Sequence, residues 1–487
     1  MKTTYAYKLF LLIGLTLFCL NNTFGQLDTI AQFSRVNSSQ SKYVRSYMLS
    51  SNEILVESIN IKKANTTFEK FDANFNVINT LELPSHPGAT KLSANNGPFI
   101  YTIFFTNDLN YFCYTINKYT FEVTHLEGKL PHEMPSTSII TNGYVCIFMG
   151  IKQRVESYAM LDFRTGKFEE IPIQLTDFQK PKIITTMKSS VSQNNEIFLY
   201  YNVYIKRKNI PILLQLNEDG QLKATHKFTT TDPKFQALEA DVTYISGDTY
   251  LITGQWGEYS KREPETTGKG VYVTRIENGK ADFFKTYKYS EMKNLYNYRS
   301  RANNDNSGSK IKLIEGNVDF HNYKLDENNV LLTGPLYSKE IITTNNSMLQ
   351  TTHNYRYYQG LAILFDLDGV LKWSESYTID FNKIMHYPID LVNYWNYDDD
   401  ILIIANSPTS SRKIVINREG EVIEETTLQN IAQPKLGFEI PDYPYKVYYW
   451  MDDFYITFGS FKFKEPSEEE GKEIEKTKYV MYKLKLE

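Results

Sequence analysis

The feature that most constrains the fold of this chain is a hairpin pattern that recurs along its length. Each copy is an apolar or alternating run, then Asp, Asn or Glu with Gly or Asn close behind, then a second alternating run. Such turn residues accept a positive φ, so the pattern predicts a β-hairpin. Seven copies occur: FEKFDANFNVINTLEL from Phe68, CYTINKYTFEVTHL from Cys113, AMLDFRTGKFEEIPI from Ala159, LLQLNEDGQLKATHKF from Leu213, VTRIENGKADFFKTY from Val273, LFDLDGVLKWSES from Leu364 and IVINREGEVIEETTL from Ile414.

A further apolar strand precedes each hairpin. These strands are NEILVES from Asn52, PFIYTIFF from Pro98, GYVCIFMG from Gly143, NEIFLYY from Asn195, DTYLITG from Asp248, NVLLTG from Asn329 and DDILIIANS from Asp399. An eighth, DDFYITFGS from Asp452, is followed by YVMYKLKL alone, so the eighth unit lacks its last strand.

Units of about 50 residues, each with four short strands and no amphipathic helix, are typical of a β-propeller. We therefore expect an all-β fold: an eight-bladed β-propeller of four-stranded antiparallel blades, with seven blades as the alternative. The stretch LDTIAQF, residues 27–33, has no hairpin partner nearby. We expect this N-terminal strand to pair with residues 479–486 and so to close the propeller. Residues 26–487 would then form a single domain.

The first 25 residues are predicted to be a signal peptide. Lys2 and Lys8 precede an apolar run over residues 9–20, which is too short to span a membrane. No later segment approaches the roughly 20 apolar residues of a transmembrane helix. We therefore expect a secreted or periplasmic protein, or one attached to the cell surface, with no transmembrane segment in the mature chain.

Charge and cysteine content narrow the classes of function. A net charge of −4 and a pI near 6.1 do not give the concentrated basic face that nucleic-acid binding requires. Beyond the predicted signal peptide, Cys113 and Cys146 are the remaining cysteines, too few for a disulfide framework. They form either one bridge or two separately buried thiols. The 37 tyrosines exceed what a core readily buries, so some should lie on a surface that binds something.

One hairpin resembles a known repeat. LDFRTGKFEE, from Leu161, is similar to the Leu-Asp-x-x-Thr-Gly-Lys hairpin of PQQ-like propeller repeats, and FDLDGVLKWSES is a looser copy. The resemblance implies the propeller fold. The PQQ-dependent dehydrogenases of that family also use an adjacent cysteine pair and a calcium site, and the absence of Cys-Cys here excludes that activity. The chain looks more like divergent secreted bacterial propellers, many of which bind polysaccharide or protein without catalysis.

Four long loops are expected, at residues 255–270, 287–310, 335–360 and 462–478. Long loops in a compact fold are usually functional or disordered, and the first three should be neighbours over blades five and six. The charge run of the fourth indicates a solvated segment. Aromatic rings with interleaved arginines stack on sugars or anchor a protein partner. The candidate ligand-binding residues are Trp256, Tyr259, Tyr296, Tyr298, Arg299, Tyr337, His353, Tyr355, Arg356, Tyr357, Tyr358 and His386.

No catalytic or metal signature accompanies these residues. The seven histidines stand alone in the sequence, and no Gly-x-Ser-x-Gly elbow or Gly-rich phosphate loop occurs. We therefore expect no metal and no cofactor. The leading hypothesis is a non-catalytic propeller that binds a glycan or protein partner. One alternative is a polysaccharide hydrolase or lyase that draws acid and base from loops holding His353, Tyr357 and His386. Another is a structural subunit of a cell-envelope or secretion assembly.

Overall fold

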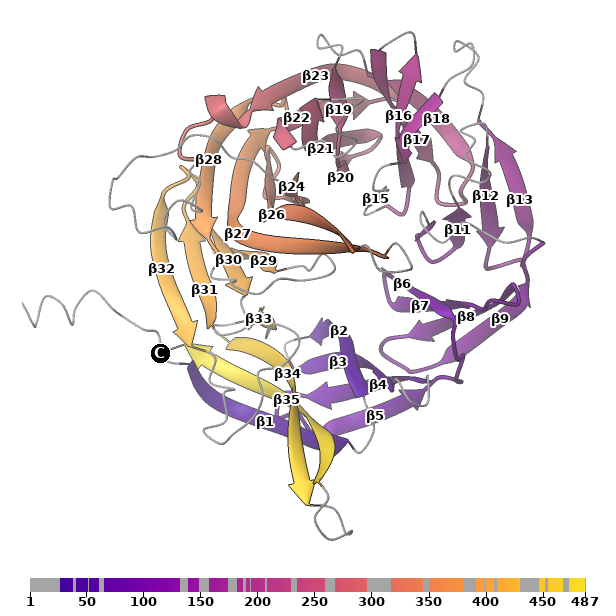
Figure 1. Cartoon of the computed structure of the whole chain (residues 1–487), viewed down its shortest axis with the longest axis vertical. Coiled ribbons are helices and arrows are strands. Elements are labelled where there is room, and N and C mark those ends of the chain that lie inside the picture. Colours follow the sequence, from indigo (N-terminus) through magenta and orange to yellow (C-terminus); the bar gives the residue numbers. More distant parts are fainter. Residues whose placement is uncertain are drawn as a thin grey trace, which may run out of the picture. The chain divides into compact units, whose positions relative to one another are not determined.

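A computed structural model shows an all-β chain (Figure 1). The predicted signal peptide, residues 1–25, lies outside the described residues. No helix within the described ranges has the length and hydrophobicity of a bilayer span. The structure describes residues 27–37, 41–50, 52–60, 65–131, 139–148, 157–173, 182–186, 190–192, 194–205, 208–228, 234–258, 268–295, 317–344, 350–379, 391–397, 399–406, 410–429, 446–451, 454–466 and 473–486.

The contacts divide the chain into two compact units. Unit 1 comprises Met1–Tyr43, Phe71–Val77 and Leu391–Glu487, and unit 2 comprises Val44–Lys70 and Ile78–Asp390, as far as these residues are described. Whether residues 26–487 form a single domain stays a prediction.

Unit 2 holds six antiparallel sheets that follow one another in chain order, coloured from indigo through magenta to orange in Figure 1. Sheet 1 has β2 (Ser41–Ser50), β3 (Glu53–Asn60), β4 (Asn65–Asp72) and β5 (Val77–Glu82); sheet 2 has β6 (Thr90–Asn96), β7 (Phe99–Phe105), β8 (Asn110–Asn117) and β9 (Val123–Lys129); sheet 3 has β10 (Ile139–Thr141), β11 (Val145–Phe148), β12 (Ser157–Asp162) and β13 (Phe168–Pro172).

In sheets 4 to 6 the innermost strand is split into two pieces. Sheet 4 has β14 (Lys182–Thr186), β15 (Ser190–Val191), β16 (Ile197–Ile205), β17 (Lys208–Leu216) and β18 (Leu222–Lys227); sheet 5 has β19 (Phe235–Ala237), β20 (Asp241–Ser246), β21 (Thr249–Glu258), β22 (Gly268–Glu277) and β23 (Lys280–Lys288); sheet 6 has β24 (Asn317–Val318), β25 (His321–Lys324), β26 (Asn329–Thr344), β27 (Gln350–Asp366) and β28 (Leu371–Thr378). A short 3-10 helix, η2 (Tyr289–Glu291), follows β23.

Unit 1 holds two further sheets. Sheet 7 has β29 (Val392–Tyr397), β30 (Asp400–Asn406), β31 (Ser410–Ile416) and β32 (Val422–Gln429); sheet 8 has β33 (Lys446–Met451), β34 (Phe454–Pro466), β35 (Glu473–Leu486) and β1 (Leu27–Asn37). The predicted all-β propeller with four-stranded antiparallel blades is confirmed. The number of blades, eight with seven as the alternative, stays a prediction.

Successive sheets of unit 2 bury apolar side chains against each other, as blades of a propeller do. Each neighbouring pair shares one cluster. One residue from each sheet identifies each cluster: Leu55 and Ile100 for sheets 1 and 2, Ile103 and Phe148 for sheets 2 and 3, Tyr158 and Leu199 for sheets 3 and 4, Phe198 and Ile252 for sheets 4 and 5, and Leu251 and Leu332 for sheets 5 and 6. Cys113 and Cys146 lie in the cluster of sheets 2 and 3 as buried free thiols. Burial raises the pKa of Cys113 to about 12.

All seven predicted hairpins are present as antiparallel pairs of the third and fourth strands of their sheets. In six of them an Asp or Asn opens the turn, and its side-chain oxygen accepts backbone N–H groups further on. Asp72 Oδ1, for example, accepts from the N–H groups of Asn74 and Asn76, both at 2.8 Å. The openers are Asp72, Asn117, Asp162, Asn217, Asp366 and Asn417. This local contact makes the repeat recognisable in the sequence.

Removing such an opener should cost about 1 kcal/mol of unfolding free energy, as the loss of a helix cap does. We expect this of Asp72→Ala, because two backbone N–H groups lose their acceptor. Asp72→Asn keeps an oxygen at the same place, as three other turns do, and should cost only a few tenths. Urea unfolding of both variants measures the difference. Equal losses in the two would contradict the role of the side-chain oxygen.

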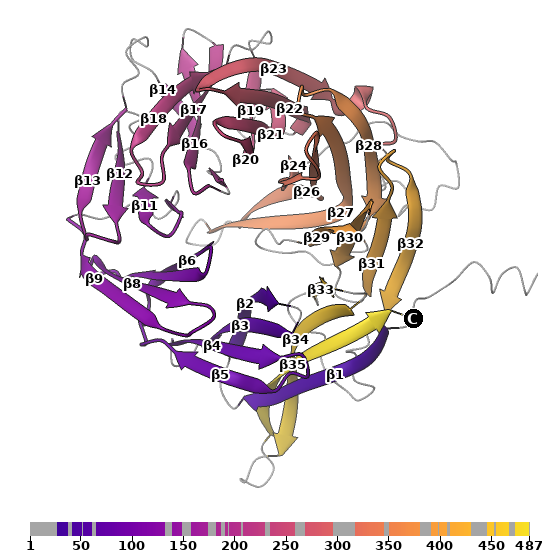
Figure 2. The ribbon, with the colours of Figure 1, turned by 180° about the vertical axis from the view of Figure 1, so that it is seen from behind.

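The N-terminal strand pairs with the C-terminal strand, as predicted from the sequence. β1 pairs antiparallel with β35, and the register runs from Leu27 opposite Leu486 to Asn37 opposite Thr477, with an irregularity between Thr29 and Ala31. Figure 2 shows β1 (indigo) beside β35 (yellow) from behind. The N-terminal strand therefore completes sheet 8, and this prediction is confirmed.

Two of the four predicted loops are wrong. Residues 335–360 fall mostly in β26 and β27, which pair from Asn329–Asp366 to Thr344–Gln350, and residues 462–478 fall mostly in the β34–β35 pair. Residues 335–360 are rich in Thr, Ile and Tyr, which favour strands over loops. Residues 462–478 are mostly Lys and Glu, so their strands follow from the ladder that continues outward from the apolar parts of β34 and β35 rather than from local preference. Only their turns, 345–349 and 467–472, lie outside the described residues. Of the other two loops, 259–267 and 296–310 also lie outside them.

Glu375 in β28 faces the segment that follows η2. Its Oε1 accepts a hydrogen bond from the backbone N–H of Ser376 (3.1 Å), and the Ser376 hydroxyl donates to the carbonyl oxygen of Asn294 (3.1 Å). Burial raises the pKa of Glu375 to about 7, although hydrogen bonds from Ser376 and Asn294 oppose the change.

This raised pKa predicts a fall in stability with rising pH. A carboxyl group that binds its proton more tightly when folded stabilises fully below its unfolded pKa of about 4.5, and that stability is lost as pH rises through about 7. Glu375→Gln should remove this loss of stability with rising pH. The loss amounts to about 1 kcal/mol of unfolding free energy, once solvent screening of the half-buried carboxyl group is allowed for. Melting temperatures across this pH window test it. If the melting temperatures of the parent protein and of Glu375→Gln changed with pH in the same way, the stabilising role of the Glu375 proton would be contradicted.

Candidate functional site

The structure describes the side chains of only some predicted site residues. Tyr259, Tyr296, Tyr298, Arg299 and His386 lie outside the described residues. His353 and Tyr358 lie in β27, where the backbone is described.

Trp256 belongs to the core rather than to a binding surface. Its side chain is 4% exposed and stacks on Phe235, with ring centroids 5.7 Å apart. Its indole N–H donates to the carbonyl oxygen of Tyr287 at 3.4 Å. The large ring fills the end of sheet 5, so the predicted surface contact at Trp256 is corrected to a packing role.

Tyr337, Tyr355 and Tyr357 come together on the β26–β27 hairpin, the long orange pair of strands in Figure 1. Tyr337 is opposite Tyr357, after a bulge that leaves Tyr358 unpaired between Tyr357 and Gln359. Directly opposed residues, and residues two apart in one strand, share a face of a sheet. The three rings therefore line one face, and the exposed Arg356 is directed to the other.

The three rings form a continuous aromatic cluster. The Tyr337 centroid lies 5.5 Å from that of Tyr355 and 5.7 Å from that of Tyr357. Tyr357 is buried, at 1% exposure, whereas Tyr337 and Tyr355 are partly exposed. Tyr337 and Tyr355 can therefore meet a ligand, and Tyr357 supports them from beneath.

Two carboxylates act electrostatically on Tyr337 of this cluster. Burial raises the pKa of Tyr337, and the negative charges of Glu239 and Asp319 raise it further. Glu239 comes from the split in the innermost strand of sheet 5, and its Oε2 accepts the backbone N–H of Phe320 at 3.1 Å. This bond fixes the Glu239 carboxylate at the Phe320 backbone, in the corresponding split of sheet 6.

The side chain of Gln255 in β21 links sheet 5 to β24 of sheet 6 and to η2. Its Oε1 accepts the backbone N–H of Val318 (3.2 Å), and its Nε2 donates to the hydroxyl of Tyr289 (2.9 Å). Sheet 5 side chains thus replace the backbone partners that the split strand of sheet 6 lacks. Both hydrogen bonds of Gln255 are buried.

Asn317 is a further polar residue next to the tyrosine cluster. It is directly opposite Tyr337 in the β24–β26 pair, so its side chain shares the face of the tyrosine cluster. Its Oδ1 is buried and has no hydrogen-bond partner among the described residues. This acceptor lies next to partly exposed rings, and a ligand or water donor reaches it only where the neighbouring side chains move apart.

Two glycines make room for this arrangement. A Cβ on Gly254 would lie 1.9 Å from the carbonyl oxygen of Glu239, and one on Gly334 would lie 2.1 Å from that of Asp319. Only a residue without a side chain allows the split strand to approach so closely. This explains the Thr-Gly that both β21 and β26 carry.

Sequence reasoning missed Glu239, Asn317 and Asp319. A usable signal exists, because Glu239 and Asp319 stand at the same distance ahead of Gly254 and Gly334 in two successive units. Comparing those units position by position would have shown the shared acidic residue.

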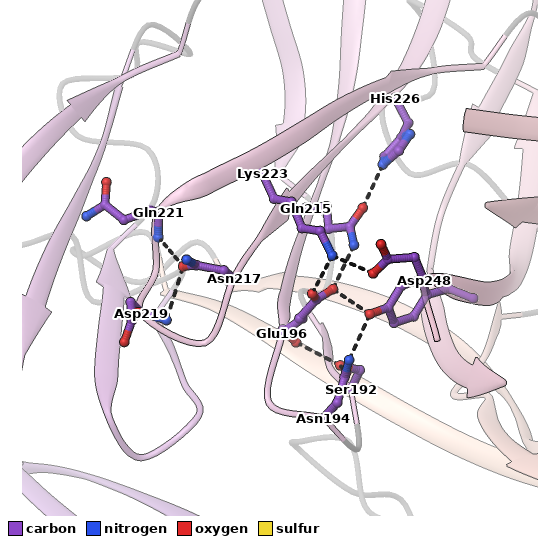
Figure 3. A network of polar contacts seen from close by, with 11 residues as sticks. Ser192, Asn194, Glu196, Gln215, Asn217, Asp219, Gln221, Lys223, His226 and Asp248 are labelled. Carbon is purple, nitrogen blue, oxygen red and sulfur yellow. Dashed lines mark hydrogen bonds and ion pairs between the residues drawn. The ribbon is translucent and has the colours of Figure 1, made fainter. Parts of the chain in front are cut away.

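A second polar cluster, around Glu196, is structural (Figure 3). The buried Glu196 carboxylate accepts from Gln215 Nε2 (2.7 Å) and from the hydroxyl of Tyr250 in sheet 5 (2.6 Å), and it pairs with Lys223 (2.9 Å). Burial lowers the pKa of His226 to about 4, and its Nε2 lies 3.0 Å from Gln215 Oε1. Because Gln215 Oε1 only accepts, the neutral imidazole carries its proton on Nε2. The cluster braces sheets 4 and 5 and leaves Glu196 fully engaged.

No group of three or more His, Cys, Asp or Glu side chains in the described part of the chain could hold a metal ion.

Comparisons with known proteins give distant likenesses only. No protein-family model and no curated protein matches the sequence. Among solved structures, the chain is similar to prolyl oligopeptidase B from Galerina marginata (12% identity, TM-score 0.39, covering 90% of this chain and 55% of that one). It is similar to the polysaccharide lyase Uly1, with 10% identity and a TM-score of 0.38 over 91% of this chain and 99% of that one. It is also similar to the β-propeller domain of the Trilobed protease from Pyrococcus furiosus, with 9% identity and a TM-score of 0.26 over 71% of this chain and 99% of that one. The propeller architecture rests on the sheets described above, and these likenesses identify no activity or ligand.

Proposed function

We propose that this chain is a non-catalytic propeller that binds a glycan at the tyrosine cluster of Tyr337, Tyr355 and Tyr357. The carrying observation is the pair of partly exposed rings beside hydrogen-bond acceptors that buried contacts hold in place. Sugar rings stack their C–H faces on aromatic side chains and donate hydroxyl protons to carboxylates and amides. Rigid acceptors next to open rings suit such a ligand, because little ordering is needed on binding.

The proposal includes the location and architecture expected from the sequence. The protein would be secreted or periplasmic, or held at the cell surface, where polysaccharides are found. All eight sheets would serve as blades, with seven as the alternative count. Electron-microscopy images averaged down the propeller axis would decide the blade number, and amino-terminal sequencing of protein from the native cell would test cleavage near Gln26.

Tyr355→Ala should weaken glycan binding about tenfold, which is about 1.4 kcal/mol, because the substitution removes a partly exposed stacking ring. The full chain is first screened on a glycan array, and the best hit is then titrated calorimetrically. Tyr119→Ala is the matched control: Tyr119 is 51% exposed in the β8–β9 turn of sheet 2, and its loss should leave the affinity unchanged.

The proposal fails if no glycan binds, or if both variants bind as the parent does. Capture of a stoichiometric protein partner that Tyr355→Ala releases would favour the protein-binding alternative instead. Turnover of a polysaccharide by the parent protein would favour the hydrolase or lyase alternative.

A further inference from the structure

From the shape of the tyrosine cluster we infer that its ligand is a single, hydrated glycan chain rather than the flat face of an ordered, insoluble polysaccharide. This inference rests on the proposed function and specifies the form in which the glycan is bound. It follows from the tilt of the rings and from the narrow hairpin that carries them.

The rings of the cluster are tilted against one another. The planes of Tyr337 and Tyr355 make an angle of 59° with centroids 5.5 Å apart, and those of Tyr337 and Tyr357 make an angle of 51° at 5.7 Å. Rings that bind a flat surface of packed sugars must be coplanar, because dispersion contact is lost wherever a gap opens between ring and sugar. A plane laid on the Tyr337 ring is inclined to the Tyr355 ring, so no flat surface can contact the faces of both.

The rings are also set into the protein rather than raised above it. Tyr357 is 1% exposed, and Tyr337 and Tyr355 are only partly exposed. A broad flat surface reaches only side chains that project beyond the protein around them. A single chain is narrow enough to reach partly buried rings, and rotation about its glycosidic bonds lets successive sugars lie at different inclinations.

The hairpin that carries the rings becomes narrow just beyond them. β24 pairs with β26 no further out than Tyr337, and β28 pairs with β27 no further out than Gln359. Among the described strands, the pairs from Ser338–Arg356 to Thr344–Gln350 therefore form a ribbon of two strands, which Figure 2 shows in orange. Paired strands lie only about 4.8 Å apart, and two-stranded ribbons twist more strongly than wide sheets. Such a ribbon can lie along one chain but offers no plane for chains packed side by side.

The test compares single chains with packed chains of the same sugars. The full chain is titrated with soluble oligomers of β-linked glucose and of β-linked N-acetylglucosamine, and it is mixed with microcrystalline particles of cellulose and of chitin. The glycan array presents further single chains. A single chain should bind, whereas binding to the particles should be at least about tenfold weaker for each exposed sugar.

Two variants link the result to the rings. Tyr355→Ala should weaken binding of the single chain about tenfold, whereas Tyr355→Phe keeps a ring of the same tilt and should weaken it less than about twofold. Any protein that the particles retain should be released by the soluble oligomer of the same sugar, because both would use the same rings. Unchanged melting temperatures confirm that the variants are folded.

The outcomes distinguish this inference from the proposed function. If the particles retain the protein, Tyr355→Ala abolishes the retention and no single chain binds or competes, the single-chain ligand is overturned and glycan binding at the cluster stands. Equal binding to single chains and to particles, for each exposed sugar, also overturns it. If neither the particles, nor the soluble oligomers, nor any chain on the array binds, both fall.

Discussion

A variant that begins at Ser34 should unfold at a markedly lower temperature than one that begins at Gln26. The two differ by Gln26 and residues 27–33, which include the first seven residues of β1 and contribute most of its ladder with β35. A net stabilisation of roughly 0.5–1.5 kcal/mol for each hydrogen-bonded residue gives a loss of about 5 kcal/mol, close to the whole stability of many domains. The shortened chain also exposes the edge of β35, so we expect aggregation as well.

Calorimetry and light scattering on the two variants measure these effects. The variant from Gln26 is the control, because it lacks only residues that precede the strand. Equal melting temperatures would show that β1 contributes nothing to sheet 8, and the closing role of β1 would have to be abandoned.

Gly254→Ala should destabilise the protein by at least about 3 kcal/mol and should also disturb the proposed ligand site. The new methyl group would stand 1.9 Å from the Glu239 carbonyl oxygen and 2.8 Å from the Tyr272 hydroxyl. No side-chain rotation relieves a clash with a backbone atom, so the split strand that carries Glu239 must move. That movement breaks the bond from the Phe320 N–H to Glu239.

The matched control is Gly247→Asn, in the β20–β21 turn of the same sheet. Gly247 has a positive φ of 51°, which asparagine tolerates, and nothing lies within 4 Å of the place that a Cβ would take. This change should cost only a few tenths of a kcal/mol by urea unfolding. If Gly254→Ala were as mild as Gly247→Asn, the close approach of the split strand would be contradicted.

The sequence predicts those parts of the fold whose causes are local. Each hairpin turn is set by one Asp or Asn and a residue with positive φ close behind, such as Gly220 or Gly369, so the pattern is visible within a few residues. The pairing of the N-terminal strand is predictable for a different reason. The eighth repeat unit lacks its fourth strand, and residues 27–33 form a strand that belongs to no other unit.

The errors have equally definite causes. The expectation of a loop at residues 335–360 follows from the repeat length, whereas the Thr, Ile and Tyr content of the stretch favours strands. Burial of Trp256 depends on Phe235, a partner from another strand that no pattern around Trp256 reveals. The carboxylate of Glu239 reaches its place through a bond to sheet 6, and only the tertiary structure brings those residues together.

The pairing of β1 with β35 also bears on how the molecule is made. β1 is synthesised before all the described strands that lie between it and β35 in the chain, so it waits through their synthesis with unsatisfied backbone groups. Contacts between successive sheets form as each emerges, whereas the β1–β35 pairing closes the longest loop, and so carries the largest loop-closure cost, among the described strand pairs. We therefore expect a slow last step in refolding, during which strand exchange between neighbouring molecules competes with self-closure at high protein concentration.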